Sequence, residues 1–361
     1  MKYSPHKYQT YATDFILEHP VSAVFLDMGL GKSVITLTAI FELCLDSFLV
    51  RKVLVIAPLR VAADTWPGEI EKWDHLRGLT YSVAVGSEAQ RKAALLQRVS
   101  VYIINRENVQ WLVEDSGLPF DYDMVVIDEL SSFKSYQAKR FRALLKVRPG
   151  VKRIVGLTGT PAPNGLEDLW PQIYLLDRGA RLGRTMRSYL DMYFDTPNSW
   201  LPYKRELKPG AEEAIYRRIG DICVSMRAAD HLKMPERVDN VVELSLSARE
   251  EKLYRRMERD MLLPYADGDV LALNAASLAG KLLQLANGAV YDEFHNVRVI
   301  HDRKLDALED LIEAANGKPV LVMVNYRHDL ARIRQRLGTY SPENPGGVRE
   351  LKTAQDMADW N

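Results

Sequence analysis

The sequence predicts an α/β protein built on a parallel β-sheet. Short, β-branched apolar runs recur through the first half of the chain, and each ends in polar residues or glycine: SAVFL, VLVIAP, VYIIN, MVVIDE and RIVGLTGTP. Stretches of mixed polar and apolar spacing, such as SVITLTAIFELCLDSF, lie between these runs and are typical of helices. Strands that alternate with helices in this way indicate a parallel sheet with helices on both faces.

The pattern changes near residue 177. Strand signals stop over about 177–235, where Arg, Tyr and Glu are frequent, and we expect a helical insertion there. Patterns typical of strands return at VDNVVELSL and PVLVMVN. We therefore expect a first domain over 1–235 that includes the insertion, and a second α/β domain over 236–361.

The composition limits the classes of protein to which the chain can belong. The chain has 361 residues, of which 47% are hydrophobic and 27% charged, and this suits two domains with real cores. Its apolar runs are too short for a membrane span, and the N-terminus lacks the apolar core of a signal peptide. Only Cys44 and Cys223 occur, so a reducing interior is the natural setting. A net charge of zero gives no general attraction to nucleic acid, although it is compatible with a local basic groove.

The stretch LDMGLGKS lies between the first apolar run and a helical pattern. It matches the end of the phosphate-loop pattern G-x-x-x-x-G-K-[ST], with Leu26 where the first glycine is expected. Such a loop leaves a strand, turns sharply and opens a helix whose amides face phosphates. Gly29 and Gly31 permit the turn, Lys32 can reach the β- and γ-phosphates, and Ser33 can bind Mg²⁺. The alternative is a plain strand-to-helix turn with an exposed lysine.

Two carboxylates end another predicted strand. Asp128 and Glu129 follow the run MVVI, and adjacent carboxylates oppose each other's ionisation unless a cation is near. In phosphate-loop enzymes an acid at this position holds Mg²⁺, and a following glutamate can deprotonate the attacking water. The alternative is a pair of solvated loop acids.

A third element follows the strand RIV. Thr158 and Thr160 flank a glycine there, and short hydroxyls near a γ-phosphate can hydrogen-bond the catalytic carboxylates and sense hydrolysis. A threonine-glycine turn is common by itself. All three elements, however, stand at strand ends of one predicted sheet, and ligands of such sheets bind outside the carboxyl ends of the strands.

With these elements together, the sequence resembles the superfamily-two helicase-like ATPases, and most of all the Swi/Snf-type DNA translocases. HKYQ is similar to the family's adenine-reading motif, which implies that Gln9 binds the base. DMGLGKS has the family's form of the phosphate loop, in which the generic first glycine is absent, so Leu26 fits the family. VLVIAPLRVAADTWPGEIEKW resembles the next motif through Trp66, Glu69 and Trp73.

The resemblance also implies roles for single residues. DELS stands where the family usually has DEAH, so Asp128 and Glu129 carry over while Ser131 replaces the histidine. LTGTPAPN resembles the third motif through Asn164. The resemblance implies ATP and Mg²⁺ as cofactors, with these residues expected at the nucleotide: Gln9, Met28, Gly29, Leu30, Gly31, Lys32 and Ser33.

The resemblance further implies two RecA-like domains that ATP closes and hydrolysis reopens. DHLKMPERVDNVVELSLSAREEKLYRRM resembles the entry into the second, and the likeness continues to the fourth motif at VNYRHDL. Two more motifs follow in the family, the last with arginines that reach the γ-phosphate, yet no Q-x-x-R-x-x-R-like stretch occurs after residue 300. We therefore expect an incomplete second RecA-like domain and slow ATP hydrolysis by this chain alone, with little stimulation by DNA.

Nucleic-acid contacts are the least defined part of the sequence. Arg178, Arg181, Arg184 and Arg187 recur every third residue, and on a helix they could meet successive phosphates. The alternative is a solvated basic face, or partners for acidic neighbours. No base-reading module is visible, so binding without sequence preference is expected. Three tryptophans could stack on bases, although their apolar neighbours favour core packing: Trp66, Trp73 and Trp111.

The leading hypothesis is a DNA-dependent ATPase that moves along duplex DNA. A strand-separating DNA or RNA helicase is one alternative, and a nucleotide-gated nucleic-acid-binding protein without turnover is another. The lack of accessory domains suggests a compact bacterial or phage protein in the cytoplasm of its cell, although the sequence leaves a nuclear protein open.

Overall fold

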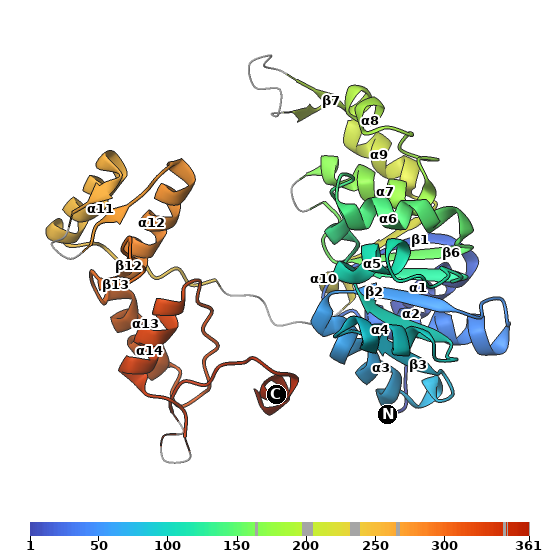
Figure 1. The fold of residues 1–361 in the computed structure, drawn as a ribbon, viewed down its shortest axis with the longest axis horizontal. Helices are drawn as coiled ribbons and strands as arrows, with labels where there is room; N and C mark the ends of the chain where they lie inside the picture. Colours follow the sequence, from blue (N-terminus) through green and yellow to red (C-terminus); the bar gives the residue numbers. More distant parts are fainter. Residues whose placement is uncertain are drawn as a thin grey trace. The chain divides into compact units, whose positions relative to one another are not determined.

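Figure 1 shows a computed structural model of the chain. The chain forms two compact units, unit 1 (Met1–Pro235) and unit 2 (Glu236–Asn361). The structure describes residues 1–162, 165–196, 205–231, 239–264, 268–341, 344 and 346–360.

A parallel sheet forms the centre of unit 1. Its seven strands within the described residues run in the order β3–β4–β2–β5–β6–β1–β9, which confirms the predicted α/β fold class. The strands are β1 (Val21–Leu26), β2 (Val53–Ala57), β3 (Tyr81–Ala84), β4 (Val101–Asn105), β5 (Met124–Asp128), β6 (Arg153–Thr158) and β9 (Cys223–Met226).

Helices cover both faces of this sheet (Figure 1). Buried side chains of α1, α2 and α3 pack on one face, and those of α5, α6 and α7 pack on the other. The interior strands are buried on both faces, which explains why their sequences are continuous apolar runs rather than alternating ones. The helices are α1 (Lys7–Glu18), α2 (Lys32–Phe41), α3 (Trp66–Lys72), α4 (Glu88–Leu95), α5 (Val109–Glu114), α6 (Lys139–Val147) and α7 (Leu169–Asp177).

The segment predicted as a helical insertion is mixed. It contains α8 (Met186–Tyr193), α9 (Ala211–Ile219), α10 (Ala228–His231) and the hairpin of β7 (Phe194–Asp195) with β8 (Glu206–Leu207). It also contains β9, which returns to the main sheet beside β1. The prediction that strands stop over this segment was therefore wrong for β7, β8 and β9. A two-stranded hairpin or an edge strand pairs on one side only and does not need a continuous apolar run.

Unit 2 has a small core, formed within the described residues by Met257, Leu263, Val270, Ala272, Leu285 and Val290. Its elements are α11 (Ala248–Asp260), β10 (Leu262–Leu263), β11 (Val270–Leu271), α12 (Ala275–Asn287), β12 (Ala289–Tyr291), β13 (Val297–Val299), α13 (Arg303–Ala314), α14 (Arg327–Leu337) and α15 (Ala354–Trp360). β10 pairs with β11 and β12 with β13, both antiparallel.

Two strands predicted in unit 2 are absent from its described part. Neither 239–246 nor 319–325 pairs as a strand, and Val241 and Met323 are 83% and 92% exposed. An apolar run becomes a buried strand only where neighbouring strands pair with its backbone and helices cover it. The sequence shows the run itself but not these neighbours, so the prediction was wrong here.

Among the helices of the described residues, none combines the length and the apolar character that crossing a membrane requires.

Candidate nucleotide site

The three predicted site elements meet at one edge of the sheet. β5, β6 and β1 are neighbours, with Asp128 opposite Leu157 and Phe25 opposite Thr158. Because all strands are parallel, the segments that follow these three strands emerge side by side. The structure thus brings together the phosphate-loop sequence, the Asp128–Glu129 pair and the threonine turn.

The loop after β1 has the backbone that a phosphate loop needs. β1 ends at Leu26 and α2 begins at Lys32. Gly29 and Gly31 have φ angles of 83° and 81°, in the left-handed region where glycine has no Cβ penalty. Gly31 is the N-cap of α2 and provides no side-chain cap, so the first amides of this helix are available to an anion.

The loop's remaining residues differ in exposure. Leu30 is buried, whereas Met28 is 84% exposed. Leu30 therefore anchors the loop, and Met28 stands free on its surface.

Lys32 already binds oxygen atoms at the start of this loop. Its Nζ donates to the main-chain carbonyls of Leu26 at 2.7 Å and of Asp27 at 3.2 Å. Burial lowers the pKa of Lys32, against the opposing effect of nearby Asp128, Glu129 and Asp27 charges. Since charge-assisted hydrogen bonds are stronger than those to neutral carbonyls, a phosphate oxygen would be a better acceptor for this ammonium.

Gln9 packs against the same loop. Its Oε1 accepts from the backbone N–H of His6 at 2.9 Å, and its Nε2 donates to the carbonyl of Leu30 at 3.3 Å. A Cβ at Gly31 would lie 2.7 Å from Gln9 Nε2 and would displace the Gln9 amide, in addition to the strain of the left-handed backbone at that position. The side-chain carbonyl of Gln9 can accept one more hydrogen bond and its NH₂ group can donate one more, and a purine base could use both.

Asp128 is a half-buried carboxylate with ordered partners. Its Oδ2 accepts from Trp66 Nε1 at 2.9 Å, and its Oδ1 accepts from the backbone N–H of Glu129 at 3.0 Å. Burial raises the pKa of Asp128, while the Trp66 hydrogen bond opposes that rise. A cation would favour the ionised form, and a carboxylate with the Ser33 hydroxyl at the start of α2 supplies the oxygen ligands that Mg²⁺ prefers.

Glu129 is held by two hydroxyl groups. Its Oε1 accepts from Thr158 Oγ1 at 2.9 Å and also from Ser131 Oγ. The backbone N–H of Thr160 donates to Thr158 Oγ1 at 3.1 Å, so Thr160 enters this network through its main chain. Glu129 has a φ of 58°, a conformation that is uncommon for residues other than glycine. Such backbone conformations cluster at functional sites.

Two members of this network were missed as site residues in the sequence. Ser131 was noted only as a replacement for histidine, and its hydroxyl is a partner of Glu129. Trp66 was considered as a base-stacking or core residue; it is fully buried, and its N–H reaches Asp128 from 62 residues away. No spacing rule along the chain could have indicated that contact. Asn164, expected in the third motif, lies outside the described residues.

The arginine run does not form the expected helix. α7 ends at Asp177, Arg178 has a φ of 60° as its C-cap, and α8 begins only at Met186. Arg178, Arg184 and Arg187 are exposed in this connection and at the start of α8. The regular spacing is interrupted because a left-handed residue ends the helix after Asp177.

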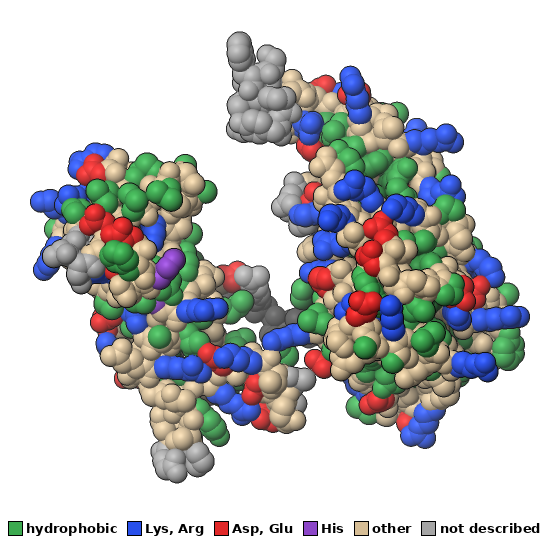
Figure 2. Space-filling model, in the orientation of Figure 1, with side chains coloured by type: hydrophobic (Ala, Val, Ile, Leu, Met, Phe, Trp, Pro, Cys, Tyr) green, Lys and Arg blue, Asp and Glu red, His purple; other side chains and the backbone are tan. Residues whose placement is uncertain are grey.

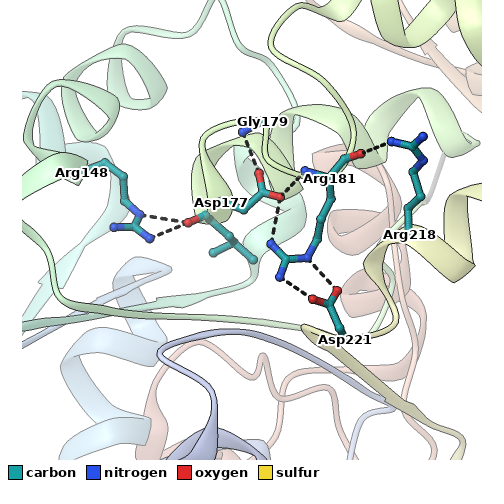
Figure 3. A network of polar contacts seen from close by, with 7 residues as sticks. Arg148, Asp177, Gly179, Arg181, Arg218 and Asp221 are labelled. Carbon is teal, nitrogen blue, oxygen red and sulfur yellow. Dashed lines mark hydrogen bonds and ion pairs between the residues drawn. The ribbon is translucent and has the colours of Figure 1, made fainter.

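Arg181 differs from the other three arginines (Figure 3). Its guanidinium donates to both carboxylate oxygens of Asp221, at 2.7 and 2.6 Å, and lies 3.4 Å from Asp177 Oδ2. Asp177 also accepts from the backbone N–H groups of Gly179 and Arg181. Arg181 therefore ties the end of α7 to the turn before β9, which matches the alternative that part of the run pairs with acidic neighbours.

A basic surface that the sequence reading missed lies on α6. Figure 2 shows Lys and Arg side chains gathered over the region of α6 and α7 on the visible face of unit 1. In α6, Lys139 and Arg142 are exposed, while Phe141 and Leu144 face the core. The signal was present as KRFR, in which three basic residues surround the buried Phe141.

The three tryptophans considered for base stacking differ in burial. Trp66 is fully buried, whereas Trp73 and Trp111 are half-buried. Trp73 Nε1 donates to Glu69 Oε2 at 2.7 Å, and the Arg91 guanidinium lies 4.2 Å from the Trp111 ring centroid. Core packing is therefore the better account of Trp66.

Known proteins match most of the chain. The family model of the SNF2-related domain matches residues 21–295. The protein p41 of Acyrthosiphon pisum secondary endosymbiont phage 1 is 36% identical over 377 residues, covering 99% of this chain and 78% of p41. The chromatin structure-remodeling complex subunit snf21 of Schizosaccharomyces pombe is 26% identical over 270 residues, covering 72% of this chain and 22% of that protein.

A solved structure also matches in fold. The SWI2/SNF2 ATPase core of Sulfolobus solfataricus, solved in complex with dsDNA, aligns with a TM-score of 0.55 and 18% identity. The alignment covers 95% of this chain and 74% of that chain.

Proposed function

Because the chain belongs to the SNF2-related domain family, a family of ATPases, we propose that it hydrolyses ATP with Mg²⁺ and couples hydrolysis to movement along duplex DNA. Membership of the family confirms the resemblance to Swi/Snf-type ATPases that the motifs indicate. ATP use follows from the family, whereas Mg²⁺, duplex DNA and movement are the parts that we add.

The observation that carries the proposal is the meeting of three elements at the ends of β1, β5 and β6. Phosphoryl transfer to water requires a helix N-terminus for the phosphates, an acid for the metal and a base for the water. Here these parts are the start of α2, the half-buried Asp128, and Glu129 held by two hydroxyls. The donor set fits both groups: ammonium and backbone amides for phosphates, carboxylate and hydroxyl for Mg²⁺.

In this proposal each residue has a distinct task. Lys32 leaves its two carbonyl partners and binds the β- and γ-phosphates, while Ser33 and Asp128 hold Mg²⁺. Mg²⁺ supplies neutralisation of the charge that develops on the phosphate oxygens. Glu129 would accept a proton from the attacking water as the water oxygen bonds to the γ-phosphorus, the bond to the bridging oxygen breaks and ADP leaves.

Other residues position the reacting groups. Thr158 and Ser131 donate to Glu129 and fix its orientation, and Thr160 holds the Thr158 hydroxyl through its amide. This chain of contacts joins β6 to the general base, so it is the route by which we propose that Thr158 and Thr160 couple the site to motion. Gln9 hydrogen-bonds the adenine base through the remaining donor and acceptor of its side-chain amide.

The proposed nucleic-acid partner is the phosphate backbone of duplex DNA. Exposed cations outside the nucleotide site supply a contact that does not depend on base sequence: Lys139, Arg142, Arg178, Arg184 and Arg187. The archaeal structure that shares this fold was solved with dsDNA, which supports a duplex as the first partner to test. The two units are proposed to be RecA-like domains, over 1–235 and 236–361.

The test is ATP hydrolysis measured without nucleic acid and with duplex DNA, single-stranded DNA or RNA. We expect Mg²⁺-dependent hydrolysis that duplex DNA raises more than the other two do. The prediction that this chain alone is slow and only weakly stimulated stays a prediction, and the rates in this assay test it. A larger rise with single-stranded DNA or RNA than with duplex DNA would count against a duplex-directed enzyme, and no hydrolysis above background would count against an ATPase.

The same experiment separates the alternatives. A strand-separating helicase would release a labelled strand from a partial duplex, in DNA or RNA, during hydrolysis. A nucleotide-gated binding protein would show no hydrolysis, yet its affinity for DNA would change when a non-hydrolysable ATP analogue is added. Fluorescence anisotropy with labelled duplex measures that second response without turnover.

A further inference from the structure

Trp66 lies in the nucleotide site although no site motif includes it in that role. Its side chain is fully buried among apolar residues at the start of α3, on the face of the sheet covered by α1, α2 and α3. From this position its indole N–H donates to Asp128 Oδ2 at 2.9 Å. We infer that Trp66 is a positioning residue that orients the Asp128 carboxylate for Mg²⁺, an inference that rests on the proposed function.

The two oxygens of Asp128 are each restrained from a different direction. Oδ1 accepts from the backbone N–H of Glu129 at 3.0 Å, and Oδ2 accepts from Trp66. Each carboxylate oxygen can accept a second hydrogen bond or bind a cation. The two donors therefore fix the plane of the carboxylate while leaving lone pairs on both oxygens for a metal.

The indole suits this task because it is rigid and closely packed. A buried Trp has only two side-chain torsions, and neighbouring side chains hold both at Trp66. The backbone link to Glu129, in contrast, comes from the next residue of the same loop and moves with it. Trp66 therefore fixes the position of the Asp128 carboxylate relative to the core of unit 1.

A plain structural reading is that Asp128 merely satisfies a buried indole N–H. The two readings differ in what the hydrogen bond controls. If Trp66 positions Asp128, loss of the N–H weakens Mg²⁺ binding even where packing is unchanged. Loss of a group that orients a metal ligand typically lowers metal affinity about 10- to 100-fold.

Trp73 offers a matched control from the same region. Its indole Nε1 also donates to a carboxylate, Glu69 Oε2, at 2.7 Å, and neither residue belongs to the nucleotide site. Trp73→Phe removes one indole N–H from a carboxylate, as Trp66→Phe does. Any general effect of losing such a contact appears in both variants.

The experiment titrates Mg²⁺ at fixed concentrations of protein and a fluorescent ATP analogue, and repeats the titration with Mn²⁺ followed by electron paramagnetic resonance. For Trp66→Phe we expect the half-saturating metal concentration to rise about 10- to 100-fold. Nucleotide binding in EDTA should stay within about twofold of the unsubstituted chain, and Trp73→Phe should leave both values unchanged. Thermal unfolding without nucleotide measures folding in each variant.

A second variant separates the N–H from packing. Trp66→benzothienylalanine keeps the shape of the bicyclic ring and replaces the N–H by sulfur, so it should reproduce the metal defect of Trp66→Phe. An unchanged metal titration for this isostere overturns the inference, because the phenylalanine defect would then come from packing. If the unsubstituted chain shows no Mg²⁺-dependent nucleotide binding, the proposed function itself fails, and the inference fails with it.

Discussion

The arginines after α7 allow a test that separates folding from nucleic-acid binding. Arg181 is held by two carboxylates, whereas Arg184 is exposed three residues later. Arg181→Met keeps most of the apolar stem and removes the charge, and Arg184→Met does the same at the exposed position. We predict that the first variant loses stability and the second loses DNA affinity.

The magnitude follows from the two carboxylates that Arg181 contacts. Asp221 has a side chain that is 64% exposed, so this pair contributes at most about 1 kcal/mol. Asp177 is 2% exposed and keeps two backbone donors, but it loses its cation, and a hydrogen bond to a charged group is worth about 1.5–3 kcal/mol. Because the guanidinium lies 3.4 Å from Asp177, we take the lower end, and expect a total loss of about 2 kcal/mol.

Thermal unfolding followed by circular dichroism measures this loss. One kcal/mol shifts Tm by about 2–4 °C in a domain of this size, so Arg181→Met should unfold about 4–8 °C lower than the unsubstituted chain. An exposed substitution such as Arg184→Met changes stability by about 0.5 kcal/mol or less. Its shift should therefore be no more than about 2 °C.

Salt-dependent binding of labelled duplex DNA gives the second readout. Loss of one phosphate contact lowers the slope of log affinity against log salt by about 0.9, and we expect that change for Arg184→Met. At a temperature where it is folded, Arg181→Met should keep the original slope. A stable Arg181→Met protein with a reduced slope would refute the reasoning, since Arg181 would then contact DNA rather than hold the fold.

Two further predictions concern single groups. Lys32→Ala removes the ammonium that we propose binds the phosphates. A charged hydrogen bond is worth about 1.5–3 kcal/mol, so this variant should bind Mg²⁺–ATP about 10- to 150-fold more weakly. Tight binding of a fluorescent ATP analogue by this variant would argue against the phosphate-loop assignment. Burial raises the pKa of Cys44 to about 11 and of Cys223 to about 12, so both thiols stay protonated in the fold. Iodoacetamide at pH 8 should modify both thiols slowly in the folded chain and quickly in denaturant, where the pKa of a cysteine is about 8.5. Because the pKa is higher in the folded state, the neutral thiols stabilise the fold below about pH 8.5. This stabilisation is lost as the pH rises toward 11. Rapid alkylation of the folded chain would show that the fold does not shield these two thiols.

The sheet shows which strands a sequence can reveal. The five strands predicted in the first half of the chain are the five interior ones, β4, β2, β5, β6 and β1. Both missed strands of this sheet, β3 and β9, lie at its edges, and each is four residues long with mixed burial. An interior parallel strand must be apolar on both faces, whereas an edge strand can be short and mixed, so only the interior strands leave a strong pattern.

The candidate site divides in a similar way. The positions of Gly31, Lys32 and Glu129 at this edge of the sheet could be predicted, because a strand end and the next few residues define them. The contact of Trp66 with Asp128 and the pairing of Arg181 with Asp221 join residues 62 and 40 positions apart. Such contacts depend on how helices pack across the sheet, and no local pattern encodes them.

The central claim is that the edge formed by β1, β5 and β6 hydrolyses ATP with Glu129 as the base. Its most direct test compares the unsubstituted chain with Glu129→Gln in single-turnover hydrolysis, with Mg²⁺–ATP binding measured on the same samples. Gln keeps an oxygen that accepts from Thr158 and Ser131 but cannot take a proton, so binding should stay within about threefold while hydrolysis falls about 10²- to 10⁴-fold. Hydrolysis by Glu129→Gln at the rate of the unsubstituted chain would contradict the account, because another group would then activate the water.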